Sequence, residues 1–99
     1  MTPRFLLAAA LAALPFTATS QDNSVARSLA ATCANCHGTE GRSATREVVS
    51  LAGLPKEHIV SQMKAFKDGT RPATVMHQLA KGYTDQQIEL IAAYFAAKK

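Results

Sequence analysis

The sequence of 99 residues contains only two cysteines, Cys33 and Cys36, and no run rich in Val, Ile, Tyr or Phe precedes them. Without such a run, the strand-then-helix setting of a thioredoxin-like redox pair is poorly supported. A zinc site needs four ligands, and His37, His58 and His77 lie at spacings that match no common zinc finger. A disulfide between the two cysteines would close a very short loop and remove little entropy from the unfolded chain. These three interpretations of the pair are therefore the weaker ones.

Long apolar runs are also scarce. The one at the start of the chain, from Phe5 to Phe16, is too short to anchor a mature protein across a bilayer, and a short basic region precedes it. Such an order, followed by small and polar residues, is typical of a secretory signal peptide. Ala18 and Ser20 have the spacing that signal peptidase requires, so we expect cleavage after Ser20 and a periplasmic protein without a transmembrane segment. A retained N-terminal anchor is the alternative.

No internal repeat, low-complexity segment or large excess of one charge is present. Residues 21–99, which we expect to form one domain, hold ten of the 11 Lys and Arg residues against seven Asp and Glu. A net charge of about +3 gives little support for a nucleic-acid partner. A domain this short buries a thin core, and small domains usually need a disulfide, a metal or a cofactor for stability.

The most informative feature that is present is Cys33-Ala34-Asn35-Cys36-His37. The pattern Cys-x-x-Cys-His is the arrangement that attaches a c-type haem. Residues three apart share one face of a helix, so both thiols can add to the vinyl groups of one porphyrin edge while His37 ligates the iron. We therefore expect one covalent haem c on Cys33 and Cys36, with His37 as an axial ligand.

Apolar spacing predicts helices throughout. Residues 24–34 place Val25, Leu29 and Cys33 on one face behind a Ser24 N-cap. Three glycines and many polar residues predict a mostly irregular segment over 38–54, with a short turn near Val48.

Two further helices are predicted in the second half of the chain. One begins with Pro55 in its first turn and ends before Gly69. Its apolar stripe consists of Ile59, Val60, Met63 and Phe66. The last helix follows the capping box Thr84-Asp85-Gln86-Gln87, which Tyr83 and Ile88 can cover as a hydrophobic staple. It repeats Ile88, Ile91, Ala92 and Phe95 on one face.

The iron needs a sixth ligand, unless the site is open for gas binding or peroxide chemistry. Met76 is the favoured candidate because it lies in a loop between two helices, after Pro72 and ahead of a short helical stretch that ends at Gly82. Met63 lies on an apolar helical stripe, where methionine is more often core filler. His77 and His58 are the remaining candidates, and a second histidine would lower the reduction potential.

Several segments together resemble a small class I c-type cytochrome. They are Cys-Ala-Asn-Cys-His-Gly-Thr-Glu-Gly-Arg at 33–42, Leu-Ala-Gly-Leu-Pro at 51–55, Gln-Met-Lys-Ala-Phe-Lys-Asp-Gly at 62–69, Met76, and Thr-Asp-Gln-Gln-Ile-Glu-Leu-Ile-Ala-Ala-Tyr-Phe at 84–95. The resemblance implies an all-α fold of three to five helices around one covalently attached haem. It also implies that His37 is the proximal ligand and Met76 the distal one.

Within that class, the stretch from Leu54 to Met76 is most similar to the cytochrome subunit of flavocytochrome c sulfide dehydrogenases. The resemblance implies an FAD-containing, sulfide-oxidising partner subunit that passes electrons to the haem, so the chain would not be an enzyme by itself. A free carrier that serves other periplasmic redox proteins is the alternative. Arg71 is a candidate for a contact with a haem propionate, although a solvated loop arginine is the default.

Val49 departs from the pattern of this class. Relatives often carry a proline at this position, and its carbonyl is thought to accept the proton of the haem-ligating imidazole. Val49 still supplies a carbonyl, but the fixed φ angle of proline is lost. A neutral substitution in a surface loop is the simpler interpretation.

Overall fold

The computed structural model describes residues 19–98, which fold into four α-helices and one short 3₁₀ helix with no strand in that range. The all-α prediction is confirmed. The predicted signal peptide lies almost wholly outside the described residues and stays a prediction. No helix between residues 19 and 98 has the length and apolar character needed to cross a membrane. In chain order the elements are α1 (Thr19–His37), η1 (Thr39–Gly41), α2 (Lys56–Asp68), α3 (Met76–Lys81) and α4 (Asp85–Ala96).

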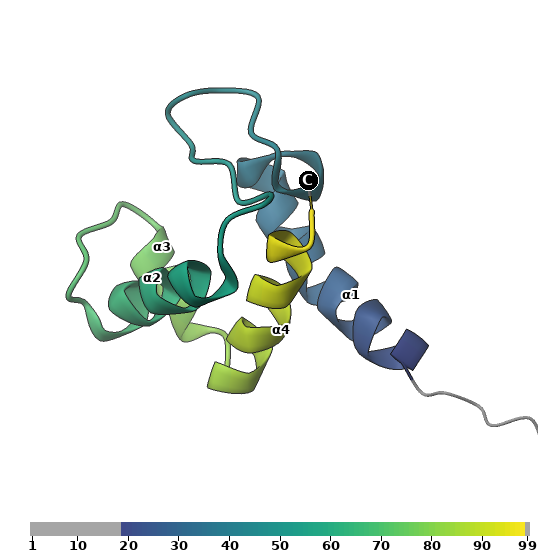
Figure 1. The fold of residues 1–99 in the computed structure, drawn as a ribbon. Helices are drawn as coiled ribbons and strands as arrows, with labels where there is room; N and C mark the ends of the chain where they lie inside the picture. The colour runs from purple at the N-terminus through teal and green to yellow at the C-terminus, as the bar shows by residue number, and fades with distance from the viewer. Residues whose placement is uncertain (1–18, 99) are drawn as a thin grey trace, which may run out of the picture.

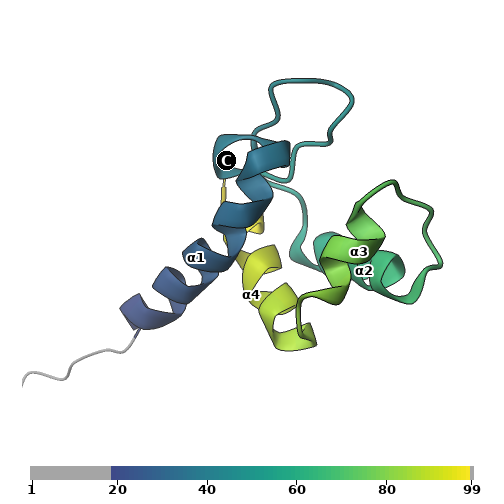
Figure 2. The same ribbon diagram turned by 180° about the vertical axis from the view of Figure 1, so that it is seen from behind.

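Helix α4 lies at the centre of the fold. It packs against α1 on one side and against α2 on the other, while α3 packs on α2 (Figure 1). The view from behind shows the same order, with α1 and α3 on either side of α4 (Figure 2). The buried core joins all four α-helices and consists of Ala30, Ile59, Met63, Ala80, Ile88, Ile91, Ala92 and Phe95.

The structure of α4 follows the sequence prediction closely. Thr84 accepts a hydrogen bond from the backbone N–H of Gln87, and the Gln87 side chain accepts one from the backbone N–H of Thr84, which completes the capping box. The predicted face is buried, since Ile88 and Phe95 are both fully inaccessible. Tyr83 is partly buried against the core cluster that contains Ile88, as the staple requires.

The prediction for α1 was wrong in two respects. The helix begins at Thr19 and ends at His37, so Ser24 lies inside it and is not its N-cap. Val25 is 50% exposed, whereas Ala26 and Ala30 are buried. The buried face is therefore displaced by one residue at this end. Alanines have short side chains, so they allow the backbones of α1 and α4 to approach closely where the helices pack.

The helix boundaries around α2 and α3 differ slightly from the prediction. Pro55 caps α2 instead of occupying its first turn, and Gly69 ends the helix with a φ of 82°, as expected of a left-handed C-cap. Ile59 and Met63 are buried on α2 as predicted. Met76 was expected in a loop, but it is the first residue of α3.

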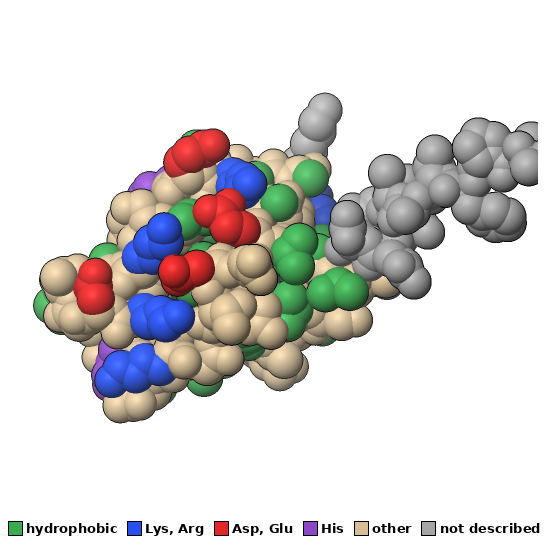
Figure 3. All heavy atoms as spheres, turned by 90° about the horizontal axis from the view of Figure 1, so that it is seen from below, with side chains coloured by type: hydrophobic (Ala, Val, Ile, Leu, Met, Phe, Trp, Pro, Cys, Tyr) green, Lys and Arg blue, Asp and Glu red, His purple; other side chains and the backbone are tan. Residues whose placement is uncertain are grey.

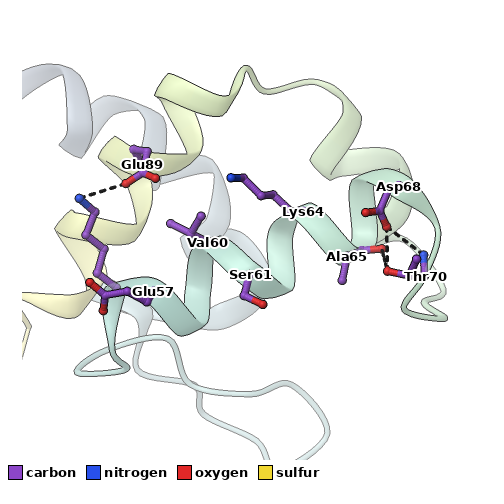
Figure 4. Close-up of a pocket in the computed structure, with 9 residues that line it drawn as sticks. Glu57, Val60, Ser61, Lys64, Ala65, Asp68, Thr70 and Glu89 are labelled. Carbon is purple, nitrogen blue, oxygen red and sulfur yellow. Dashed lines mark hydrogen bonds and ion pairs between the residues drawn. The ribbon is translucent and has the colours of Figure 1, made fainter.

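The face seen from below carries Lys and Arg side chains interspersed with Asp and Glu (Figure 3). Two ion pairs connect α2 to α4, with 3.0 Å between Lys56 and Glu89 and 3.8 Å between Lys67 and Asp85. The ion pair of Lys56 borders a hollow of about 570 Å³ next to α2 (Figure 4). The hollow has mostly charged and polar walls and includes none of the candidate haem ligands.

Candidate functional site

The last turn of α1 carries the three residues of the Cys-x-x-Cys-His motif. Cys33 is partly buried and packs against the core, whereas Cys36 is exposed, and both are free thiols. Burial raises the pKa of the Cys33 thiol, with a hydrogen bond to Thr32 opposing this in part. The two thiols are three residues apart on this turn, which is the spacing needed to reach one edge of a planar ring.

His37 is held by the chain that returns after α1. Its Nδ1 atom lies 2.6 Å from the carbonyl oxygen of Val49. A carbonyl oxygen can only accept, so Nδ1 carries the proton and donates it in this contact. The opposite ring nitrogen, Nε2, is then deprotonated in the neutral ring and available as a metal ligand. The hydrogen bond expected from the sequence is therefore present, although Val49 is not a proline.

Gly38 and Gly41 make the path from His37 to Val49 possible. Gly38 has a φ of 90°, and a Cβ atom there would lie 1.8 Å from the carbonyl oxygen of Arg42. Gly41 has a φ of 82°, and a Cβ atom there would lie 2.6 Å from the ring of Phe95. Neither position can hold a larger residue without rearrangement of the segment that carries Val49.

Met76 is the first residue of α3. Its side chain is partly buried against the core cluster. Tyr83, two residues after the end of α3, connects this part of the chain to two other helices. Its hydroxyl lies 2.7 Å from the Thr32 hydroxyl on α1, and Lys67 on α2 donates a 2.7 Å hydrogen bond to its carbonyl. These contacts fix α3 relative to the helix that carries the cysteines. Among residues 19–98, no hydrogen bond or ion pair joins Met76 directly to the Cys33–His37 segment.

The segment before Met76 is also ordered. Asp68 accepts hydrogen bonds from both the backbone N–H and the hydroxyl of Thr70, at 3.1 and 2.8 Å, and these bonds lower the pKa of the Asp68 carboxyl. Arg71 donates a hydrogen bond to Gln62, and its guanidinium carbon lies 4.6 Å from the centre of the Phe66 ring. Arg71 is thus engaged on α2, and its contact with a haem propionate stays a prediction.

The other candidate iron ligands have different environments. Met63 is only 7% exposed and belongs to the core cluster, as its place on the apolar stripe predicted. His58 is exposed in the first turns of α2. His77 is half-buried, and its Nδ1 atom is buried without a hydrogen-bond partner among the described residues.

Large apolar side chains are exposed on the two segments that flank this region. Val49 is 58% exposed, Val75 is 54% exposed and Leu79 is 51% exposed. Val49 is the residue whose carbonyl contacts His37, whereas Val75 directly precedes Met76 and Leu79 lies three residues after it. Leu79 was not predicted as a site residue, although it lies three residues after Met76, which places both on one side of a short helix.

Comparison with known proteins defines the class. The sequence model of the cytochrome c family matches residues 25–97. The cytochrome subunit of sulfide dehydrogenase from Chlorobaculum tepidum is 46% identical over 67 residues, which are 68% of this chain and 60% of that protein. Cytochrome c-554(548) from Halomonas halodenitrificans is 35% identical over 69% of this chain and 86% of its own length. The thiosulfate dehydrogenase electron acceptor from Thiomonas intermedia is 35% identical over 97% of this chain but only 44% of its own length.

The protein is thus a haem-binding electron-transfer protein of the all-α class. It belongs to the cytochrome c family, and its cofactor is covalently bound haem c. The chain spans about 60% of the sulfide dehydrogenase subunit and less than half of the thiosulfate dehydrogenase electron acceptor.

The described residues fit this cofactor. Two free thiols and an imidazole with an available Nε2 lie at one helix end. The exposed side chains of Val49, Val75 and Leu79 offer apolar surface to a porphyrin. The Nδ1 atom of His77 is a further buried polar atom without a hydrogen-bond partner among the described residues. The two thiols, the imidazole and the apolar side chains are groups that a covalently attached haem would use.

Proposed function

We propose that Cys33 and Cys36 form the thioether bonds to the haem and that His37 and Met76 are the axial iron ligands. The single observation that carries this proposal is the 2.6 Å hydrogen bond from His37 Nδ1 to the Val49 carbonyl. It fixes the tautomer and the orientation of the ring directly after the two thiols, as expected of a histidine that binds metal.

Haem supplies one-electron chemistry when it is bound. The residues of the chain attach it, hold its axial positions and keep water from part of its surface. With His37 and Met76 both bound to iron, no position is left for a substrate. The chain therefore transfers electrons and does not catalyse a reaction by itself.

The proposed donor is an FAD-containing subunit that oxidises sulfide, and the proposed compartment is the periplasm, with a mature domain of residues 21–99. Similarity to the sulfide dehydrogenase subunit of Chlorobaculum tepidum supports this partner, as does the resemblance of residues 54–76. A free carrier would use the same haem ligands but would dock briefly on several redox proteins. Copurification of a flavoprotein with the haem from native periplasm distinguishes the two.

Covalent attachment is tested by cysteine variants. Cys36→Ala removes one thioether and Cys33→Ala with Cys36→Ala removes both, so haem staining on a denaturing gel should fall in the single variant and vanish in the double variant. Ser43→Ala, which leaves the motif intact, serves as the control. Haem that remains covalently attached to the double variant would refute the proposed attachment.

A further inference from the structure

The chain that returns towards α2 is fixed at five consecutive residues. The Val49 carbonyl accepts from His37, and the Ser50 hydroxyl oxygen accepts a 2.9 Å hydrogen bond from the backbone N–H of Ser43. The next two N–H groups, of residues 51 and 52, both donate to the Gly41 carbonyl at 2.7 and 3.1 Å. The N–H of residue 53 donates to the carbonyl of residue 95 on α4 at 2.9 Å. The Val49 carbonyl is therefore the first member of a continuous row of anchored residues.

Among these five residues, Ser50 is the one that holds the loop through its side chain. Residues 43 and 50 are seven positions apart, so their hydrogen bond closes the loop between them directly beside Val49. Beyond this contact, the chain is held through backbone N–H groups, by the Gly41 carbonyl and then by the carbonyl of residue 95. Without the Ser50 hydroxyl, the nearest hydrogen-bonded residue on the C-terminal side of Val49 is residue 51, two positions away.

Val49 itself contributes no rigidity of its own. Its φ angle is not fixed by a ring, and among residues 19–98 its N–H donates no hydrogen bond. A proline at position 49 would restrict φ and would lose no hydrogen bond of the protein. The Ser43–Ser50 contact thus acts where a proline would otherwise stiffen the backbone.

We propose that Ser50 is a positioning residue for the iron ligand, because its hydroxyl clamps the loop to Ser43 and holds the Val49 carbonyl against His37 Nδ1. This inference rests on the proposed role of His37 as an axial ligand. The clamp keeps the imidazole in one orientation and one tautomer. The hydroxyl therefore replaces, through one side-chain hydrogen bond, the conformational restriction that a proline would supply.

The chain offers matched controls for this inference. Ser50→Ala removes the clamp, whereas Ser50→Thr keeps a hydroxyl at the same position. Ser43→Ala preserves the clamp, because Ser43 contributes its backbone N–H to it and uses its own hydroxyl for a 2.9 Å hydrogen bond to the Thr45 carbonyl. Val49→Pro in the Ser50→Ala background supplies backbone rigidity without the hydroxyl.

The test measures solvent exchange of the His37 Nδ1 proton by NMR in the reduced holoprotein. Loss of one hydrogen bond that closes the loop should speed exchange about fivefold in Ser50→Ala. Exchange in Ser50→Thr and Ser43→Ala should match the wild type, and Val49→Pro should return the Ser50→Ala rate towards it. Equal exchange in wild type and Ser50→Ala would overturn the proposal, as would an equally large effect of Ser43→Ala.

Ligation is measured separately in the same samples. Ring protons of a haem-bound His37 are shifted far upfield by the porphyrin in the wild-type protein. Absence of that shift in the wild type contradicts the proposed function, whereas the clamp is judged by the differences in exchange between variants. The hydrogen bond between His37 and Val49 belongs to the protein fold, so those differences are informative in either case.

Discussion

His37 receives its orientation from a residue twelve positions away in the chain. The spacing of Cys33, Cys36 and His37 could be recognised from sequence, because one helical turn dictates their relation. The contact to Val49 could be anticipated only from the backbone carbonyl that this residue supplies. The contact forms because the backbone conformations of Gly38 and Gly41 place the returning chain beside the imidazole.

Met63 is buried in the core cluster, whereas Met76 is partly buried against it. Met76→Ala should open the sixth position of the iron, abolish the weak sulfur-to-iron band of the ferric protein in the far red and allow the reduced protein to bind carbon monoxide. Optical spectra before and after addition of the gas measure this effect.

Met63→Ala is the matched comparison. Met63 is buried among the core residues, so its removal should lower the free energy of unfolding by about 2–5 kcal/mol and leave the haem spectrum unchanged. Loss of the far-red band in Met63→Ala, with its retention in Met76→Ala, would show that the distal ligand is on α2.

At the scale of elements, the sequence predicts best where the signal is local. The capping box and the apolar spacing of α4 lie within twelve residues and are confirmed in every position that the prediction named. The face of α1 was predicted less well, because Val25 is the larger apolar residue but the packed positions are Ala26 and Ala30. Close packing against α4 favours the small side chain, and spacing alone does not report that preference.

The connecting segments show why the remainder could not be predicted. Composition indicated an irregular chain over 38–54, and most of it is irregular, but η1 forms at Thr39–Gly41 and a turn at residues 52–53. Its course is determined by the close approach of Gly41 to Phe95, which is a tertiary contact. The start of α3 at Met76 likewise depends on packing against α2 and on the contacts of Tyr83.

Among residues 19–98, the buried core is small and several large apolar side chains are exposed. Eight residues form the buried cluster, and the large apolar residues Val49, Val75 and Leu79 are about half exposed. Under the proposed attachment to Cys33 and Cys36, the haem gives these side chains an apolar partner. The cofactor therefore completes a core that this short chain forms only in part.

A redox partner is expected to dock on the surface around the haem edge. We expect the residues nearest the haem edge to be a mostly small and uncharged set, namely Ala34, Asn35, Pro72, Ala73, Thr74, Val75 and His77. Charge introduced there would be desolvated without a partner on docking, so Ala73→Glu should weaken association with a sulfide-oxidising flavoprotein while the haem spectrum stays the same. Sulfide-dependent haem reduction in the reconstituted pair measures this.

An exposed site away from that surface supplies the control. Lys64 lies on α2 and lines the charged hollow (Figure 4). The variant Lys64→Glu should leave haem reduction unchanged. If reduction by sulfide survives Ala73→Glu at normal partner concentration, or if no flavoprotein binds, the free-carrier function replaces the subunit function.

We propose that this protein holds a haem whose two axial positions are both filled by the chain, so that it carries electrons and binds no substrate. The most direct measurement is the optical spectrum of the reduced wild-type holoprotein before and after exposure to carbon monoxide. We expect no change in the spectrum, because His37 and Met76 occupy both axial positions of the iron. A prompt shift to a carbon monoxide complex in the wild type would contradict it and would indicate an open site for gas binding or catalysis.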